Sequence, residues 1–338
     1  ISSTLSNNDL GWERTRQYNL GFELGLFNNR IRLEGDFYDS QSLDLLLNVP
    51  VPTITGYSTQ MQNIGKVQNR GMEFTLNTKN LTGEFSWSSN FNISFNKNKV
   101  LEVGVDGRPI YGSAANANNA FITKPGYPIA SFYGYKYIGV FQSEEELAKY
   151  PHLSGDKVGD GRYEDVNKDG VLDQNDKTIL GDNNPLFTAG FSNSFSYKNF
   201  TLDIQFTGSY GAEVFSFYKR MCGIYHGDRN GMIEQLGRWQ SKDQPGDGIH
   251  FRPTRTPSGW QRDPSSAWVQ DASYLRLRNL TLGYNFDQKV LDKMKMKGLR
   301  LYVTGQNLFK ITNYVGYDPE TSSEIGLAQG GDYLGYPA

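Results

Sequence analysis

Apolar and polar residues alternate along much of the chain. In the stretch FTLDIQFT, Phe200, Leu202 and Ile204 fall on one face of an extended strand, and Thr201 and Asp203 fall on the other. Each apolar face is about as long as the 9 to 11 residues that a tilted strand needs to cross a bilayer. Eight spans with this period can be placed, near residues 12–27, 30–42, 66–78, 84–97, 186–198, 199–210, 273–286 and 298–311. The pattern therefore predicts an all-β protein, a transmembrane antiparallel β-barrel.

The segments between these spans are of two kinds. The short ones lie at residues 28–29, 78–83, 198–199 and 287–298. The asparagines in the first and third favour tight hairpin turns, because Asn tolerates a positive φ. The long ones cover roughly residues 40–66, 97–186, 208–272 and 312 onward. Alternation of short turns with long loops is typical of barrels whose turns lie in the periplasm and whose loops lie outside the cell.

Strand parity predicts where the chain begins and ends. The first span runs into a short turn, so the chain is expected to start outside the cell, and the last span climbs outward with no returning strand. Bacterial barrels have an even number of strands that starts and ends in the periplasm. We therefore expect residues 1–338 to be a portion of a larger barrel. Residues 97–186 are expected to form one long extracellular excursion, because SFYGYKYIGVFQ within it carries aromatics on both faces.

Composition excludes several other classes. The mean hydropathy of -0.57 is compatible with a barrel, in which only alternate residues are apolar, and no stretch approaches the roughly 18 apolar residues of a membrane helix. A formal net charge of -2 lacks the basic excess that a nucleic-acid partner requires. Cys222 is the single cysteine, so there is no internal disulfide framework. No nucleophile elbow, HExxH or GxxxxGK[ST] motif is present, and we predict that the chain is not an enzyme.

The run DVNKDGVLDQND at residues 165–176 has the spacing of a calcium-binding loop. Gly170 supplies the sharp turn, and the candidate ligands are Asp165, Asn167, Asp169, Val171 through its carbonyl, Asp173 and Asp176. Asp176 stands where a bidentate Glu is usual, which shortens the reach of that ligand. We predict a structural Ca²⁺ that braces the long excursion. The alternative is a solvated acidic turn whose side chains cap their own backbone.

A second long loop is rich in aromatic and basic residues. The candidates for contact with a substrate or partner are Tyr225, Arg229, Trp239, Trp260 and Trp268. Large aromatic faces stack on sugar rings and peptide side chains, and Arg adds polar contacts, which favours a binding surface. The alternative is that the loop packs on itself and on its neighbours.

The stretch YLRLRNLTLGYNF changes parity part-way along. Leu275 and Leu277 share one parity, whereas Leu280 and Leu282 take the other. A β-bulge would produce this shift. A strand that rises beyond the membrane, with its two arginines pointing outward above the lipid, would also produce it.

Several long stretches resemble the C-terminal part of the SusC family of TonB-dependent outer-membrane transporters. They are NNDLGWERTRQYNLGFELGLFNNRI, LLLNVPVPTITGYSTQMQNIGKVQNRGMEF, GRYEDVNKDGVLDQNDKTILGDNNPLFTAGFSNSFSYKNFTLDIQFTGSYG, SYLRLRNLTLGYNF and GLRLYVTGQNLFKITNYVGYDPE. The resemblance covers almost the whole chain and implies a 22-stranded barrel, in which the eight spans and one further strand would be strands 14 to 22. The plug, the TonB-binding segment, the first half of the barrel and the last strand are not in this sequence.

The same resemblance implies a function. Family members import oligosaccharides or peptides across the outer membrane of Gram-negative bacteria, and they pair with a SusD-like surface lipoprotein and the TonB complex. We expect this activity of the longer protein to which the chain would belong. One alternative is a SusC-like barrel that serves as a scaffold without transport. Another is a soluble, calcium-dependent glycan-binding β-protein.

Overall fold

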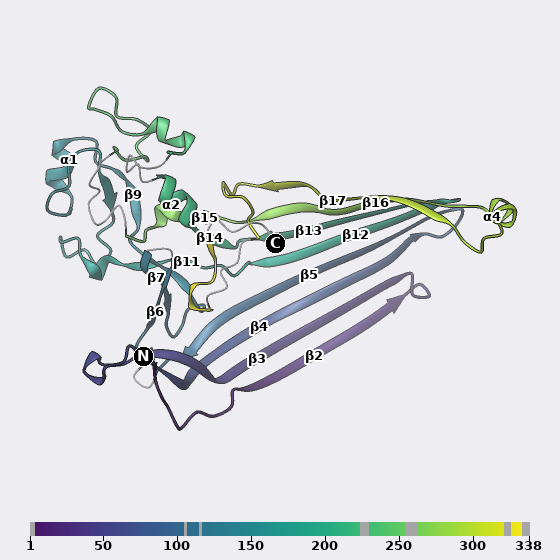
Figure 1. Ribbon diagram of the computed structural model, residues 1–338, viewed down its shortest axis with the longest axis horizontal. Coiled ribbons are helices and arrows are strands. Elements are labelled where there is room, and N and C mark those ends of the chain that lie inside the picture. The colour runs from purple at the N-terminus through teal and green to yellow at the C-terminus, as the bar shows by residue number, and fades with distance from the viewer. Residues whose placement is uncertain are drawn as a thin grey trace.

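The long strands form one antiparallel sheet in a computed structural model, which describes residues 4–104, 107–114, 117–223, 230–253, 263–320 and 326–332. Within these residues, the main path of the sheet follows the order β17-β16-β13-β12-β5-β4-β3-β2, a simple up-and-down meander (Figure 1). Its strands are β2 (Arg14–Leu26), β3 (Ile31–Pro50), β4 (Thr59–Leu81), β5 (Phe85–Glu102), β12 (Phe187–Tyr197), β13 (Phe200–Tyr210), β16 (Tyr274–Asn285) and β17 (Arg300–Thr312). A short strand, β1 (Thr4–Leu5), pairs with β4 in parallel. All eight predicted spans are therefore confirmed as strands.

The short connections lie together at one end of the sheet (Figure 1). Tyr197 pairs with Phe200 across a two-residue turn in which Lys198 has a φ of 51°. Asn28 and Asn29 have φ values of 55° and 60°, the left-handed conformation expected of a tight hairpin. The fourth connection holds a short helix, α4 (Gln288–Met294). The predicted separation of short turns from long loops is confirmed.

Two strands are longer than predicted. β3 continues to Pro50 and β4 begins at Thr59, so the prediction of a loop over residues 40–66 is wrong for most of that range. The pairing of these strands shifts register between Ser42 and Leu45, where Asp44 has a φ of 57°. This bulge interrupts the alternation of the sequence, and for that reason the continuation of the strand is not visible in the hydrophobic pattern. A one-turn helix, η1 (Thr53–Thr55), closes the hairpin.

Cross-strand rows give the sheet two chemically different faces. One row is apolar and consists of Leu20, Phe37, Met72 and Phe95. The adjacent row on the opposite face is polar and consists of Asn19, Tyr38, Gly71 and Asn96. Leu20 is 72% exposed and Val303 is 76% exposed, so protein does not cover the apolar face at these positions. Such a face is stable against lipid, and we therefore identify it as the membrane-facing side of the barrel wall.

Aromatic rings gather at both ends of the apolar face. Near the short turns, Trp87 stacks on Phe195 with ring centroids 5.8 Å apart. Near the long loops, Phe187 stacks on Tyr210 at 5.5 Å. Between these positions β12 spans 11 residues, which is the length of a transmembrane strand. Two aromatic girdles of this kind mark the two membrane interfaces of a barrel.

The parity change in β16 is a β-bulge. Gln205 of β13 pairs with Asn279, and the next residue, Phe206, pairs with Leu277, so Arg278 is the extra residue. The bulge keeps Leu277 on the apolar face beside Phe206. It also turns Arg276 to the polar face, where the guanidinium is buried. The first of the two explanations for the parity change is therefore correct.

The long connections fold together at the other end of the sheet (Figure 1). We call the described residues of 107–181, 213–271 and 326–332 the loop assembly. Its small sheets contain β6 (Ile110–Ala114), β7 (Ala117–Thr123), β8 (Ser131–Gly134) and β11 (Thr178–Gly181); β9 (Tyr137–Val140) and β10 (Gly161–Tyr163); and β14 (Glu213–Ser216), β15 (Val269–Asp271) and β18 (Gly331–Asp332). Its helices are α1 (Glu144–Lys149), η2 (Gln174–Asp176), α2 (Phe217–Gly223), η3 (Ile233–Gly237), η4 (Ser266–Trp268) and η5 (Gly326–Ala328). Among the described residues, no helix has both the length and the apolarity to span a membrane.

Candidate functional site

The loop assembly has a hydrophobic core of its own. Phe121, Phe132 and Phe215 are fully buried, and Trp268 is 3% exposed. Phe121 and Phe132 meet edge to face at 5.7 Å, and both rings contact Phe215. These residues come from two connections that are far apart in sequence. The loops therefore form one packed body that can position side chains accurately.

Two of the five candidate contact residues are described, one buried in this body and one half-buried against it. Trp268 belongs to the core, and Trp239 packs against the same cluster. A Cβ placed on Gly159 would lie 2.4 Å from the ring of Trp239, so the ring sits directly on that glycine. The burial of Trp268 fits the packing interpretation, and contact of these residues with a substrate or partner stays a prediction. Tyr225, Arg229 and Trp260 lie outside the described residues.

A pocket of about 260 Å³ opens beside Trp268. Its wall includes the side chains of Phe251, His250, Gln235 and Trp268. Gln235 Oε1 and Trp268 Nε1 are buried and have no hydrogen-bond partner among the described residues. Lys219 adds an ammonium group whose pKa is lowered by burial, against the opposing charge of Glu234. An aromatic wall with an ammonium group and a side-chain amide suits a polar group such as a hydroxyl or an amide.

Ion pairs brace the loop assembly and the adjoining rim. Arg252 binds the buried carboxylate of Asp160 in a bidentate manner, at 2.7 and 3.1 Å, and so joins two excursions. At the rim, Arg276 contacts Asp318 at 2.6 Å and Glu320 at 2.8 Å. Burial by itself would raise the pKa of Asp318, but the hydrogen bonds from Arg276 and from the Glu320 N–H, together with the charges of Arg276 and Lys310, lower the pKa of this carboxyl overall. We call Arg276, Asp318 and Glu320 the rim clamp. It ties the segment after β17 to the polar face of the wall.

The predicted calcium loop is closed by its own backbone. Asp165 accepts N–H groups from Lys168 and Gly170 at 2.7 and 2.9 Å. Asp176 is fully buried and accepts from Val166 and Asp173 at 2.9 and 2.8 Å. Among the residues that can be described, no group of three or more His, Cys, Asp and Glu side chains has a metal-binding arrangement. These hydrogen bonds fit the self-capped turn, and each carboxylate still has lone pairs that they do not use. Calcium binding stays a prediction.

The chain matches the family described as "TonB dependent receptor-like, beta-barrel" over residues 1–308. It belongs to this family of TonB-dependent receptors. TonB-dependent receptor P3 of Formosa agariphila is 35% identical over 353 aligned positions, which cover 100% of this chain and 34% of the relative. TonB-dependent receptor SusC of Bacteroides thetaiotaomicron is 30% identical over 330 positions, which cover 94% of this chain and 31% of the relative. The chain thus spans about a third of the length of these relatives.

Solved structures share the fold of this receptor barrel. A structure of the RagAB peptide transporter superposes with a TM-score of 0.80 at 24% identity, covering 98% of this chain and 35% of that one. The RagAB peptide importer in its closed-closed state gives a TM-score of 0.76 at 25% identity, covering 96% and 35%. The predicted likeness to SusC and the predicted all-β barrel fold are both confirmed. The family resides in the outer membrane, which agrees with the two aromatic girdles.

The polar face of the receptor wall carries a network of side-chain amides. Asn69 Oδ1 accepts from Asn96 at 3.2 Å and from Asn98 at 3.0 Å, and the Tyr38 hydroxyl donates to Asn96 Oδ1 at 3.0 Å. Such uncharged groups form hydrogen bonds with water or with a polar solute and do not favour a solute of either charge. In a closed barrel this face lines the lumen.

Sequence reasoning did not find the pocket, the rim clamp or the Asp160–Arg252 pair. Each is made by residues that lie far apart along the chain, such as Arg276 and Asp318, which are 42 positions apart. One signal was present, since Arg276 and Arg278 stand out in a strand of otherwise apolar and neutral residues. Charged residues within a barrel strand indicate the polar face or the rim, where they find partners.

Proposed function

We propose that the receptor containing this chain imports oligosaccharides or peptides through its barrel. The observation that carries the proposal is the loop assembly, a packed body with a pocket that stands at one end of a wall whose inner face is lined with amides. A ligand held there enters a polar channel. The similarity to RagAB, which is named a peptide importer, supports the peptide class. The oligosaccharide class rests on the resemblance to the SusC family.

On this proposal the long loops face outward and the short turns face the periplasm. A SusD-like surface lipoprotein closes over the loop assembly, and the TonB complex acts through parts of the receptor that precede this segment. Within this chain, the buried ion pairs hold the loops in place. The pocket beside Trp268 contacts polar groups of the ligand, and the amide network binds water along the lumen.

Uptake in the native bacterium tests the proposal. A strain that lacks the whole gene should lose growth on one oligosaccharide or peptide mixture supplied as the sole carbon or nitrogen source. The intact gene should restore growth, whereas a version without the TonB-binding segment should not, although it should still co-purify with the lipoprotein. Normal growth of the deletion strain on every such nutrient, with loss of a larger surface complex instead, would establish the scaffold alternative.

A further inference from the structure

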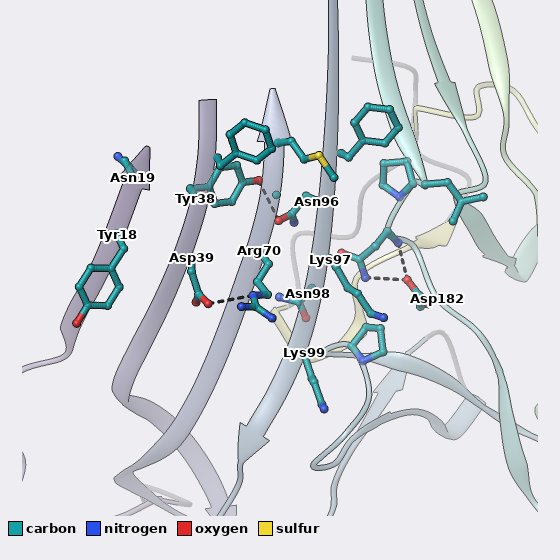
Figure 2. A pocket seen from close by; sticks show the side chains of 18 of the residues that line it. Tyr18, Asn19, Tyr38, Asp39, Arg70, Asn96, Lys97, Asn98, Lys99 and Asp182 are labelled. Atoms are coloured by element: carbon teal, nitrogen blue, oxygen red, sulfur yellow. Dashed lines mark hydrogen bonds and ion pairs between the residues drawn. The ribbon is translucent and has the colours of Figure 1, made fainter. Parts of the chain in front are cut away.

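The membrane face of the wall contains a notch. β5 continues to Glu102, but its pairing with β12 ends at the Thr188–Ser94 pair. Beyond that point the chain at Gly126 and Tyr127 pairs with the strand at Val100, and the loop residues Gly126, Pro128 and Leu186 line the margin of the notch. Together with the neighbouring strands they enclose a groove of about 910 Å³ (Figure 2).

One end of the groove is apolar. Phe37, Met72 and Phe95 form a cross-strand row on the membrane face, and Leu186 adds a side chain that is 65% exposed. This row is the last apolar row before the loops. A hydrocarbon chain from the adjoining leaflet would therefore bury surface that protein leaves open.

The other end is basic. The next row toward the loops on the same face contains Asp39, Arg70 and Lys97, and the row after it contains Lys99 (Figure 2). Successive rows on one face lie about 7 Å apart, because each strand residue advances 3.3 to 3.4 Å. The groove thus changes from apolar to basic over the distance that separates the acyl chains of a lipid from its headgroup.

The acidic groups in the groove are already engaged. Asp39 binds Arg70 at 3.0 Å and accepts from Gln68 at 2.8 and 3.0 Å. Asp182 accepts from the backbone and side-chain nitrogens of Asn184, both at 2.8 Å. Lys97 and Lys99 are exposed and form no ion pair with any residue that the structure describes. Two ammonium groups therefore remain available to an anion from outside the chain.

We propose that the groove binds a membrane lipid whose headgroup carries a phosphate. The acyl chain lies along Phe37, Met72 and Phe95, and the phosphate accepts hydrogen bonds from Lys97 and Lys99, with Arg70 adjacent. Ammonium groups are compact donors that suit phosphate, and basic residues at a membrane interface recognise anionic headgroups. The bound lipid would fill the notch and seal the wall at the place where β12 does not cover β5.

Native mass spectrometry of the full-length receptor, delipidated in detergent, tests this proposal. The probes are lipid A that carries a phosphate, the same lipid without phosphate, and inorganic phosphate. We expect the phosphorylated lipid to bind best. The variant Lys97→Gln with Lys99→Gln should bind it about 30-fold more weakly, the contribution of two basic side chains at a lipid surface. Lys289→Gln with Lys293→Gln, on α4 at the opposite rim, removes the same charge and should bind as the native receptor does.

Three results would overturn the proposal. If the native receptor and the Lys97 and Lys99 variant bind the phosphorylated lipid with equal affinity, these lysines do not contact the headgroup. If the lipid binds equally well with and without its phosphate, the groove recognises only the acyl chains. Binding of inorganic phosphate as tight as that of the lipid would indicate a soluble anion site. Both lysines are exposed, and heat-modifiable migration in gels verifies that each variant is folded.

Discussion

The barrel wall and the loop assembly place similar apolar residues in opposite environments. In the wall, large apolar side chains such as Leu20 and Val303 point away from the protein. In the loop assembly, Phe121, Phe132 and Phe215 point inward and are fully buried. The wall needs lipid to cover its apolar surface, whereas the loop assembly covers its own. Stability therefore comes from the membrane in one region and from close packing in the other.

The two regions also differ in how far apart along the chain their contacting residues lie. Five of the seven pairings along the wall join strands that follow each other closely in the chain, and the other two, β5 with β12 and β13 with β16, join strands on either side of a long connection. The loop core joins Phe121 to Phe215 and Trp268, residues that are separated by long stretches of chain. We therefore expect a substitution in the core of the assembly to leave the pairing of the wall strands in place.

The largest expected effect comes from a cavity in the loop core. Phe215→Ala should destabilise the loop assembly by about 3 to 5 kcal/mol, since it removes a fully buried ring that touches three others. Hydrogen exchange in residues 117–181 should accelerate, while heat-modifiable migration of the barrel stays normal. Phe191→Ala, on the membrane face, is the matched control and should leave that exchange unchanged. Unchanged exchange in Phe215→Ala would mean that the loops are not one packed body.

A smaller effect should distinguish the two faces of the wall. Phe91 lies midway between the girdles on the membrane face, and Asn92 is the next residue and faces the other way. Phe91→Lys should cost about 2 to 4 kcal/mol because it places a charge at the bilayer midplane, whereas Asn92→Lys should change stability little. The measurement is guanidinium unfolding of the full-length receptor in phospholipid vesicles. Equal losses in the two variants would contradict the assignment of faces.

The smallest expected effect is that of calcium on the loop at residues 165–176. Extracellular calcium sites bind with dissociation constants of roughly 0.1 to 1 mM, so millimolar Ca²⁺ would stabilise the loop by about 1 kcal/mol. Calorimetric titration should show binding heat that disappears in Asp165→Ala with Asp169→Ala. The control is Asp287→Ala with Asp292→Ala, at the opposite rim. If the native protein and the loop variant give the same heats, the acidic run is only a self-capped turn.

Sequence patterning predicted the wall well because membrane strands obey a simple rule. Alternation located all eight long strands, and the Asn and Lys turns fixed their direction. It failed where the chain leaves that rule, at the bulge near Asp44 and in the short strands of the loop assembly. Burial there depends on partners that a local pattern does not contain. Trp268 illustrates this limit, since an aromatic residue in a long loop suits a contact surface as well as a core.

The bulge at Arg278 has a consequence for how this strand can change in length during evolution. Because Arg278 is the unpaired residue, its deletion would leave Leu277 on the lipid side and Arg276 on the lumen side, next to their present partners in β13. Deletion of Leu280 would instead exchange the faces of every residue on one side of the gap. Arg278 can therefore be deleted without changing which face the other residues of β16 occupy, whereas its neighbours cannot. Relatives that differ in length along this strand should differ at that site.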